Sequence, residues 1–393
     1  MTYYLEKALE IKDEIIKNRR EIHQNPELGF NLEKTIALVV DRLESYGYEP
    51  KIVGKAGVTA TVGSGSPVIL LRGDMDALPM DETTGLEFAS CNGATHSCGH
   101  DGHTSMLLGA ARILKQNEAN LKGTVKFMFQ PAEEILGGAL DMIENGILEN
   151  PKVDAAVALH LYAGDTESRM GDIYLSRGQA MSSADAFNIK VKGKNSHGSR
   201  PEEGIDAIIV ACNIVIGLQT ILAREISMFD SCVVLAGKIY GGDTVNTTSG
   251  HATVEVSARA NNEESRDFII KRIKEISEGI AQTYRAEVEI EHTMGAPSMF
   301  NDVDLVDDIV EFSKDIIGEE KINVVPMKSG TEDFAYVGLK VPAVMINIGA
   351  GTIEDGYIHG MHNAGMQFNE DVLPLGSSLY ADVATKYLEK YSK

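Results

Sequence analysis

The order of predicted strands and helices is the feature that most constrains the fold of this chain. After two helical stretches at residues 3–25 and 33–46, short β-rich runs alternate with helical segments up to about residue 160. Strands separated by helices favour a largely parallel sheet with helices on both faces. We therefore expect an α/β fold, with a mixed, largely parallel sheet flanked by helices.

The pattern changes in the middle of the chain. From residue 184 the expected order is strand, helix, two strands, helix and strand, which is the order of a ferredoxin-like α+β unit. After residue 294 the strand and helix alternation resumes. A length of 393 residues also favours two domains. The sequence therefore predicts a discontinuous domain at residues 1–183 and 294–393 and an inserted domain at residues 184–293.

The charge balance limits the partners of the protein. With 36 Lys and Arg residues against 58 Asp and Glu residues, the formal charge is −22. Such a chain repels nucleic-acid phosphates and anionic lipids, so we expect no nucleic acid and no membrane as a partner. The apolar stretch at residues 205–218 is interrupted by Asp206 and Asn213, and the first 23 residues carry charges throughout. These features predict no membrane span and no signal peptide, and hence a cytoplasmic protein.

Four potential metal ligands lie within eight residues in the segment HSCGHDGH at residues 96–103. They are His96, Cys98, His100 and His103. Imidazole and thiolate together suit Zn(II) and other borderline transition metals, and the two glycines allow the loop to turn tightly enough for its ligands to converge. The alternative is a polar loop at the start of a helix, with Asp101 as its cap and exposed histidines.

Other polar side chains follow neighbouring predicted strands. Asp74 and Asp76 follow one strand, Glu133 and Glu134 follow the next, and His160 ends a third. In open α/β sheets the carboxyl ends of the strands form the functional edge, so these groups are expected to meet there. One of two adjacent glutamates can bind a cation while the other takes a proton from water. Ordinary loop aspartates and an acidic first helical turn are the alternatives. His359 or His362, late in the chain, could complete the set.

The inserted domain carries its own candidate residues. His197 lies in a loop after the first strand, Asn246 lies between two strands, and Arg259 lies near the end of the next strand. A histidine and an arginine on a separate domain could bind a substrate anion and an oxyanion. A solvated loop and a surface arginine are the alternative interpretation.

Several separated motifs, in order, resemble those of the two-metal aminoacylase and carboxypeptidase G superfamily. The resemblance is closer to the branch that contains N-acyl-amino-acid amidohydrolases, hippurate hydrolase and indole-acetyl-amino-acid hydrolases. The similarity spans nearly the whole chain. The motifs are RREIHQNPELGF, LRGDMDALPMDE, HSCGHDGH, FQPAEE, ALH at 158–160, NSHGSRPEEGIDA, GTEDFAY at 330–336 and MHNAGMQF at 361–368.

The resemblance implies a set of residue roles. It implies two divalent metal ions per subunit, Mn(II) or Zn(II), held by Cys98, His100, Glu134, His160 and His362. Glu133 would be the general acid/base, and Asp76 would support the ligands. His197 would polarise the scissile carbonyl, within one subunit or across a dimer interface, and Asn246 and Arg259 would face the substrate. The inserted domain would serve as a lid and dimerisation domain in a homodimer or homotetramer.

The resemblance also implies the reaction. We expect metal-dependent hydrolysis of the amide bond of N-acyl amino acids, with Glu133 taking a proton from the attacking water and delivering it to the leaving amine. A dipeptidase or carboxypeptidase acting on short peptides, or a deacetylase of an N-acetyl-amino-acid intermediate, would share all the metal motifs. A non-catalytic metal-binding protein is less favoured, because Glu133 is present.

Overall fold

The computed structural model describes residues 2–392, which form two compact units. Unit 1 contains the residues up to Ala180, Phe300–Met327, and the residues from Asp333 onward. Unit 2 contains Met181–Met299 and Lys328–Glu332. Each unit has its own cluster of buried hydrophobic side chains, so each has the core that a domain needs.

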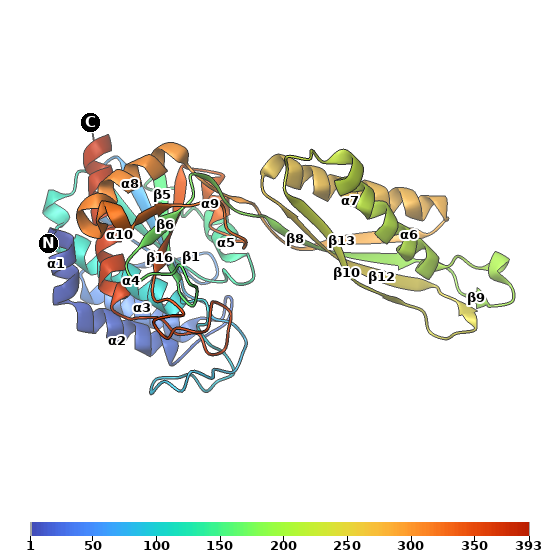
Figure 1. Cartoon of the computed structure of the whole chain (residues 1–393), viewed down its shortest axis with the longest axis horizontal. Coiled ribbons are helices and arrows are strands. Elements are labelled where there is room, and N and C mark those ends of the chain that lie inside the picture. The colour runs from blue at the N-terminus through green and yellow to red at the C-terminus, as the bar shows by residue number, and fades with distance from the viewer. Residues whose placement is uncertain (1, 393) are drawn as a thin grey trace. The chain divides into compact units, whose positions relative to one another are not determined.

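Unit 1 is built on an eight-stranded sheet of order β1-β2-β4-β3-β5-β16-β6-β15 (Figure 1). The strands are β1 (Lys51–Val53), β2 (Gly57–Gly63), β3 (Val68–Asp74), β4 (Thr124–Gln130), β5 (Ala155–Tyr162), β6 (Ile173–Leu175), β15 (Ile322–Val324) and β16 (Ala343–Gly349). The central strands β4, β3, β5 and β16 pair in parallel. The β1–β2, β2–β4 and β16–β6 pairs are antiparallel. The predicted α/β class with a mixed, largely parallel sheet is confirmed.

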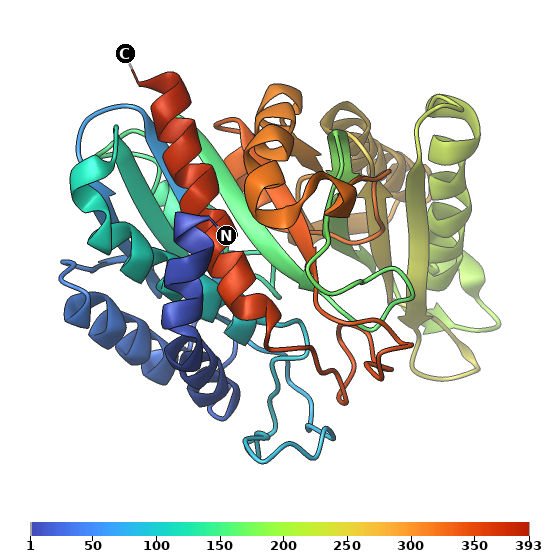
Figure 2. The same ribbon diagram turned by 60° about the vertical axis from the view of Figure 1, so that its left-hand side comes forward.

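Helices cover the sheet of unit 1. One group packs together around the long C-terminal helix α10, which lies across the sheet beside α1 and α4 (Figure 2). This group contains α1 (Tyr3–Glu10), α2 (Lys12–His23), α3 (Glu33–Ser45), α4 (His100–Gln116), α8 (Val303–Ile317) and α10 (Val372–Tyr391). The short helices α5 (Gly138–Glu144) and α9 (Ala335–Gly338) contact each other and the sheet. With helices on both sides, β3 and β4 are buried at every position, as parallel strands require.

Three details differ from the prediction. The helix expected at residues 3–25 is two helices, because the backbone leaves the helical region at Ile11 (φ −109°, ψ 15°). Helix α4 begins at His100, inside the segment HSCGHDGH that was expected to be a loop, so two of the candidate ligands lie in its first turn. The strands β1, β6 and β15 were not predicted, because three residues are too few for a recognisable periodicity.

Unit 2 has a four-stranded antiparallel sheet of order β10-β12-β8-β13. Its strands are β8 (Ala184–Lys192), β10 (Cys232–Gly241), β12 (His251–Ala260) and β13 (Glu287–Ala296), and its helices are α6 (Ala207–Thr220) and α7 (Glu263–Thr283). The two outer positions of this order are taken by the second and fourth strands of the unit, which is the ferredoxin-like arrangement. Alternate residues of β12 are buried because the two helices cover one face of the sheet.

Helix α6 and the turn of π-helix after it, Ala207–Glu225, are long and apolar enough to cross a membrane by length and composition alone. In the structure Val210, Ile214 and Leu218 on one side of α6 are buried in the core of unit 2. The Asp206 carboxylate accepts hydrogen bonds from the amides of Ile208 and Ile209 and caps the helix. One side of the helix therefore packs in the core of unit 2, together with α7.

Candidate metal centre

The loop before α4 places two donors side by side. Gly99 precedes the helix with φ +85°, a left-handed conformation that side chains other than glycine rarely adopt. This turn lies between Cys98 and His100 and brings both to the carboxyl edge of the sheet of unit 1. Both side chains are buried. The sequence prediction of a tight, glycine-dependent loop agrees with this backbone.

The five ligands that the resemblance implies all lie together in unit 1. The Cys98 Sγ is 3.5 Å from His160 Nε2 and 3.3 Å from His362 Nε2. The Glu134 carboxylate is 3.7 Å from His100 Nε2 and 3.6 Å from His362 Nε2. Cys98 belongs to two overlapping sets of donors, one with His100 and His160 and the other with Glu134 and His362.

The donor set fits a transition-metal centre. Donors that sit about 2.0–2.3 Å from one tetrahedral ion are themselves about 3.3–3.7 Å apart, which is the spacing found here. His100 Nε2 and Glu134 Oε1 are buried and have no hydrogen-bond partner among the described residues. Buried polar atoms are normally paired, so two facing atoms without partners indicate a site for a cation.

Asp76 supports this arrangement from behind. Its Oδ1 accepts a hydrogen bond from the Glu133 amide (2.9 Å), and its Oδ2 accepts one from the Glu134 amide (3.2 Å). Its backbone carbonyl lies 2.8 Å from His100 Nδ1, which leaves His100 Nε2 directed at the donor cluster. Asp76 therefore orients one imidazole and both glutamates without facing the cluster itself, as outer residues of metal sites do.

The backbone around the glutamates and around His362 adopts unusual conformations. Ala132 and Leu136, on either side of Glu133 and Glu134, have φ +55°, and His362 has φ +62°. Left-handed conformations of residues other than glycine cost free energy and gather at functional sites. Here they lie beside Glu134 and at His362, which share a donor set with Cys98.

Burial in the donor cluster disfavours the charged forms of three of its side chains. It raises the pKa of the Cys98 thiol, raises the pKa of the Glu134 carboxyl, and lowers the pKa of His160 well below its usual range. A bound cation reverses the first two effects, because it stabilises thiolate and carboxylate. The site is therefore suited to cations and poorly suited to anions.

His103 was one of the four candidate ligands in the loop, but both of its ring nitrogens are already used. Its Nδ1 lies 2.6 Å from Asp74 Oδ1, and its Nε2 accepts a hydrogen bond from the Leu161 amide (2.8 Å). Burial opposes the charge of Asp74, but Arg72, His100 and His103 hold the pKa of this carboxyl well below its usual range. The Asp74 carboxylate and the neutral His103 ring are therefore a buried hydrogen-bonded support beneath the ligands, a role that the local sequence does not indicate.

A second buried network anchors the loop to the N-terminal helix α2. Arg19 Nε donates to Asp101 Oδ2 (2.7 Å), and the side chains of Arg19 and Asp101 are at most 2% exposed. His23 Nδ1 lies 2.8 Å from the same oxygen, and His23 Nε2 lies 3.1 Å from Glu82 Oε1. Arg19 Nη1 also contacts Glu370, just before α10. The motif RREIH at residues 19–23 supplies Arg19 and His23 to this network.

The other two histidine candidates lie outside the described donor sets. His96 is buried, and neither of its ring nitrogens has a partner among the described residues. Burial lowers the pKa of His96 to about 3, so it is a neutral ring. His359 also belongs to none of these sets. Between the two late histidines left open by the sequence, His362 is the one beside Cys98.

Unit 2 brings two of its three candidates together. His197 lies on β9 (Ser196–His197), which pairs with β11 (Thr247–Thr248), and the Gly198 amide bonds the Asn246 carbonyl (2.9 Å). Arg259 lies at the far end of β12, eight residues or about 26 Å beyond His251 at an ordinary strand rise. It bonds Thr331 (2.9 Å). One copy of unit 2 therefore cannot present all three side chains to the same carbonyl group.

Comparison with known proteins identifies relatives of nearly the full length of the chain. The sequence pattern of peptidase family M20/M25/M40 matches residues 70–386. The hippurate hydrolase of Campylobacter jejuni is 36% identical over 387 residues, which are 97% of this chain and 98% of that protein. The N-acetylcysteine deacetylase of Bacillus subtilis is 34% identical over 382 residues, which are 95% of this chain and 97% of that protein.

A solved structure agrees with this result. A Bacillus subtilis protein, a dinuclear metal-binding peptidase of family M20, is 32% identical to the chain. It superposes with a TM-score of 0.80 and covers 97% of this chain and 99% of its own. The two folds therefore correspond throughout.

Cys98→Ala is expected to lower metal affinity by about tenfold or more, because a ligand of both donor sets is lost. Metal content after dialysis against dilute chelator, measured by plasma mass spectrometry, tests this. Cys91→Ala is the matched control, since the Cys91 side chain is exposed and belongs to neither set. Equal metal content in the two variants would remove the thiolate from the centre.

Proposed function

The chain belongs to peptidase family M20/M25/M40, and we propose that it uses two divalent cations, Mn(II) or Zn(II), to hydrolyse the amide bond of N-acyl amino acids. One observation carries the proposal. Two overlapping donor sets share Cys98 and lie beside a further buried carboxylate, that of Glu133. The proposed ligands are Cys98, His100, Glu134, His160 and His362. Bound cations would polarise the amide carbonyl and lower the pKa of the water nucleophile.

Glu133 is the proposed proton carrier. Its Oε2 lies 3.9 Å from His100 Nε2, so it borders the donor cluster, and its amide is held by Asp76. A carboxylate in this position accepts the proton of the attacking water and then delivers it to the leaving amine, so that the amine departs neutral. The carboxylate of Glu134, the next residue, is turned toward His362 and remains available to bind the cations.

The substrate class follows from the relatives. The names of a hippurate hydrolase and an N-acetylcysteine deacetylase both describe removal of an acyl group from an amino acid, and both proteins align with almost the whole of this chain. These relatives support an N-acyl amino acid as the substrate, with an aromatic or a small acyl group. A dipeptidase or carboxypeptidase of the same family, acting on short peptides, is the alternative.

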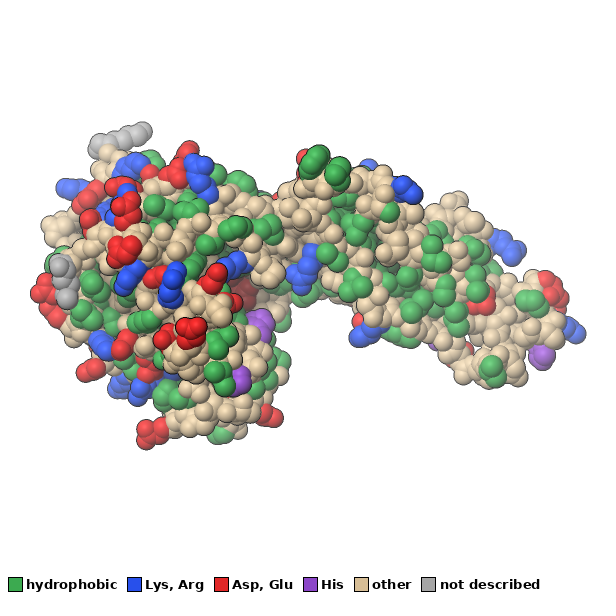
Figure 3. Space-filling view, viewed as in Figure 1, with side chains coloured by type: hydrophobic (Ala, Val, Ile, Leu, Met, Phe, Trp, Pro, Cys, Tyr) green, Lys and Arg blue, Asp and Glu red, His purple; other side chains and the backbone are tan. Residues whose placement is uncertain are grey.

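Unit 2 is proposed to supply the remaining groups and the contact between subunits. Its edge strand β10 exposes Val233, Leu235 and Ile239, and its helix α6 exposes Ile209 and Ile216. Figure 3 shows hydrophobic side chains spread over the visible surface of this unit. An exposed sheet edge with apolar side chains is suited to pairing with a second copy. In such a homodimer, or a homotetramer built from it, His197 and Asn246 would come from one subunit and Arg259 from the other.

The reaction is tested with protein stripped of metal and reconstituted separately with Mn(II), Zn(II), Co(II) and Ni(II). Substrates are matched N-acetyl, N-benzoyl and indole-acetyl amino acids and the corresponding free dipeptides. We expect metal-restored release of the amino acid from the acylated set. Cleavage of the dipeptides alone would assign the protein to the peptidases. Absence of hydrolysis of every substrate by the metal-loaded protein would contradict the proposal.

Glu133→Ala is expected to keep both metals and to lower kcat by about 10²–10⁴-fold, because the proton carrier is lost while the ligands remain. Plasma mass spectrometry and steady-state kinetics on the best substrate measure the two effects. Glu144→Ala, at the exposed end of α5, is the control. A near wild-type rate in Glu133→Ala would overturn the assignment.

Light scattering is expected to give at least twice the chain mass of 42.6 kDa, and Leu235→Lys on β10 is expected to shift the protein toward single chains. Mixing inactive Glu133→Ala with inactive His197→Ala subunits should restore up to about a quarter of the activity, because a mixed dimer contains one intact pairing of the two residues. Particles of 42.6 kDa only, or no recovery on mixing, would oppose the shared site.

A further inference from the structure

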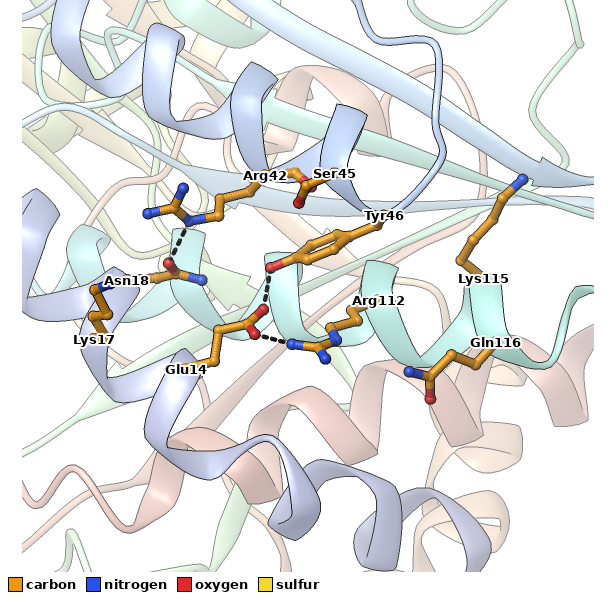
Figure 4. Close-up of a pocket in the computed structure, with 9 residues that line it drawn as sticks. All are labelled: Glu14, Lys17, Asn18, Arg42, Ser45, Tyr46, Arg112, Lys115 and Gln116. Carbon is orange, nitrogen blue, oxygen red and sulfur yellow. Dashed lines mark hydrogen bonds and ion pairs between the residues drawn. The ribbon is translucent and has the colours of Figure 1, made fainter.

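A large cavity of unit 1 lies apart from the candidate metal centre. It has a volume of about 710 Å³ and lies between α2, α3 and α4 (Figure 4). Arg112 lines it, twelve residues along α4 from His100, which corresponds to about 18 Å at 1.5 Å per residue. None of the candidate metal ligands borders it. A ligand of this cavity would therefore be distinct from the substrate.

The lining of the cavity is cationic in a strongly acidic protein. It contains four cationic side chains, Lys17, Arg42, Arg112 and Lys115, and one carboxylate, Glu14, which leaves a formal lining charge of +3. The whole chain carries −22. A local concentration of the minority charge in a concave site raises the local concentration of anions.

The charge of the one carboxylate in the lining, that of Glu14, is already balanced by a partner inside the cavity. Glu14 forms an ion pair with Arg112 and accepts a hydrogen bond from the Tyr46 hydroxyl (2.6 Å), as Figure 4 shows. The acidic partners of Arg42 and Lys115 lie outside the lining. They are the exposed Asp41 and Glu21 for Arg42 and the half-buried Glu118 for Lys115. Exposed ion pairs are weak, so an anion can replace these partners at little cost. Lys17 is exposed and has no ion pair among the described residues.

A buried amide completes the site. The Asn18 side chain lines the cavity, but the residue is only 1% exposed, and its Oδ1 accepts from Arg42 Nε (2.9 Å). Its Nδ2 is turned to the side of the Tyr46 hydroxyl and has no hydrogen-bond partner among the described residues. Because Arg42 fixes which end of the amide is the donor, Nδ2 is turned toward the interior beside Tyr46 (Figure 4). An unpaired buried donor next to two guanidinium groups is suited to an acceptor oxygen of a ligand.

We propose that this cavity binds a small molecule that carries a diphosphate group. The lining charge of +3 matches the three negative charges of a diphosphate near neutral pH. Guanidinium groups bind phosphate oxygens in pairs, and ammonium groups add point charges around them. The volume lies within the usual range for small-molecule sites.

The test is isothermal titration of the full-length, metal-loaded protein with inorganic pyrophosphate, in a buffer without phosphate and at low salt. Wild type is compared with Lys17→Glu/Lys115→Glu, which changes the lining charge from +3 to −1, and with Lys340→Glu, an exposed lysine of unit 1 outside the lining. We expect Kd to rise by about tenfold or more in the double variant and to stay unchanged in the control. Lys17→Gln, a single exposed substitution, should show a smaller rise and serves if the double variant does not fold.

Three results would overturn the proposal. Equal pyrophosphate binding in wild type and both cavity variants would place the anion at the metals, and absence of binding by the wild type would remove the site. Tricarballylate, which carries three carboxylates, is the comparison ligand, and binding as tight as that of pyrophosphate would reject a phosphate-specific site. Metal content is measured before and after titration, so that extraction of metal is distinguished from binding. The readout requires no hydrolysis, so its outcome is independent of the proposed activity.

Discussion

The free-energy cost of burying ionisable groups together is the constraint on which the active region of this protein depends. Cys98, Glu133 and Glu134 lie close together at the carboxyl edge of the sheet, and water is largely excluded from all three. Such groups are tolerated only when they are neutral, paired or bound to a cation. The surrounding structure supplies part of the compensation, since Asp76 holds the two glutamates by their amides rather than by their carboxylates. The carboxylate oxygens are thereby left for cations.

The supports of the centre are networks built on buried aspartates. Arg72 and His103 share Asp74, and Arg19 and His23 share Asp101. In each network one aspartate lies between an arginine and a histidine. Asp101 follows the proposed ligand His100 directly in the sequence, and Asp74 Oδ2 lies 3.7 Å from His100 Nε2. Removing one partner from a buried network of this kind leaves an uncompensated charge, so the two networks fix the loop in a single arrangement.

Much of the fold and of the site could be predicted from the sequence, for identifiable reasons. Strand and helix periodicities are local, so the order of β3, α4, β4 and β5 was predictable, and the clustering of Cys98 and His100 in one short segment was evident. The supports were not predictable, because Arg19 and Asp101, or Gln130 and Asp333 (2.6 Å apart), are far apart in the sequence and each looks like an ordinary surface residue. The cationic cavity was not predictable for the same reason, because its four cationic side chains come from three helices.

The position of β16 has a consequence for how the chain is made. This strand lies between β5 and β6 in the sheet of unit 1, yet it follows the whole of unit 2 in the sequence. While the ribosome is still translating residues 181–299, β5 and β6 lack the strand that joins them, and His362 does not yet exist. Unit 2 is nearly continuous in sequence and has its own core, so it can fold on the nascent chain before the sheet of unit 1 is complete. The donor cluster therefore closes only near the end of translation, so an incomplete chain released early cannot hold the full set of ligands.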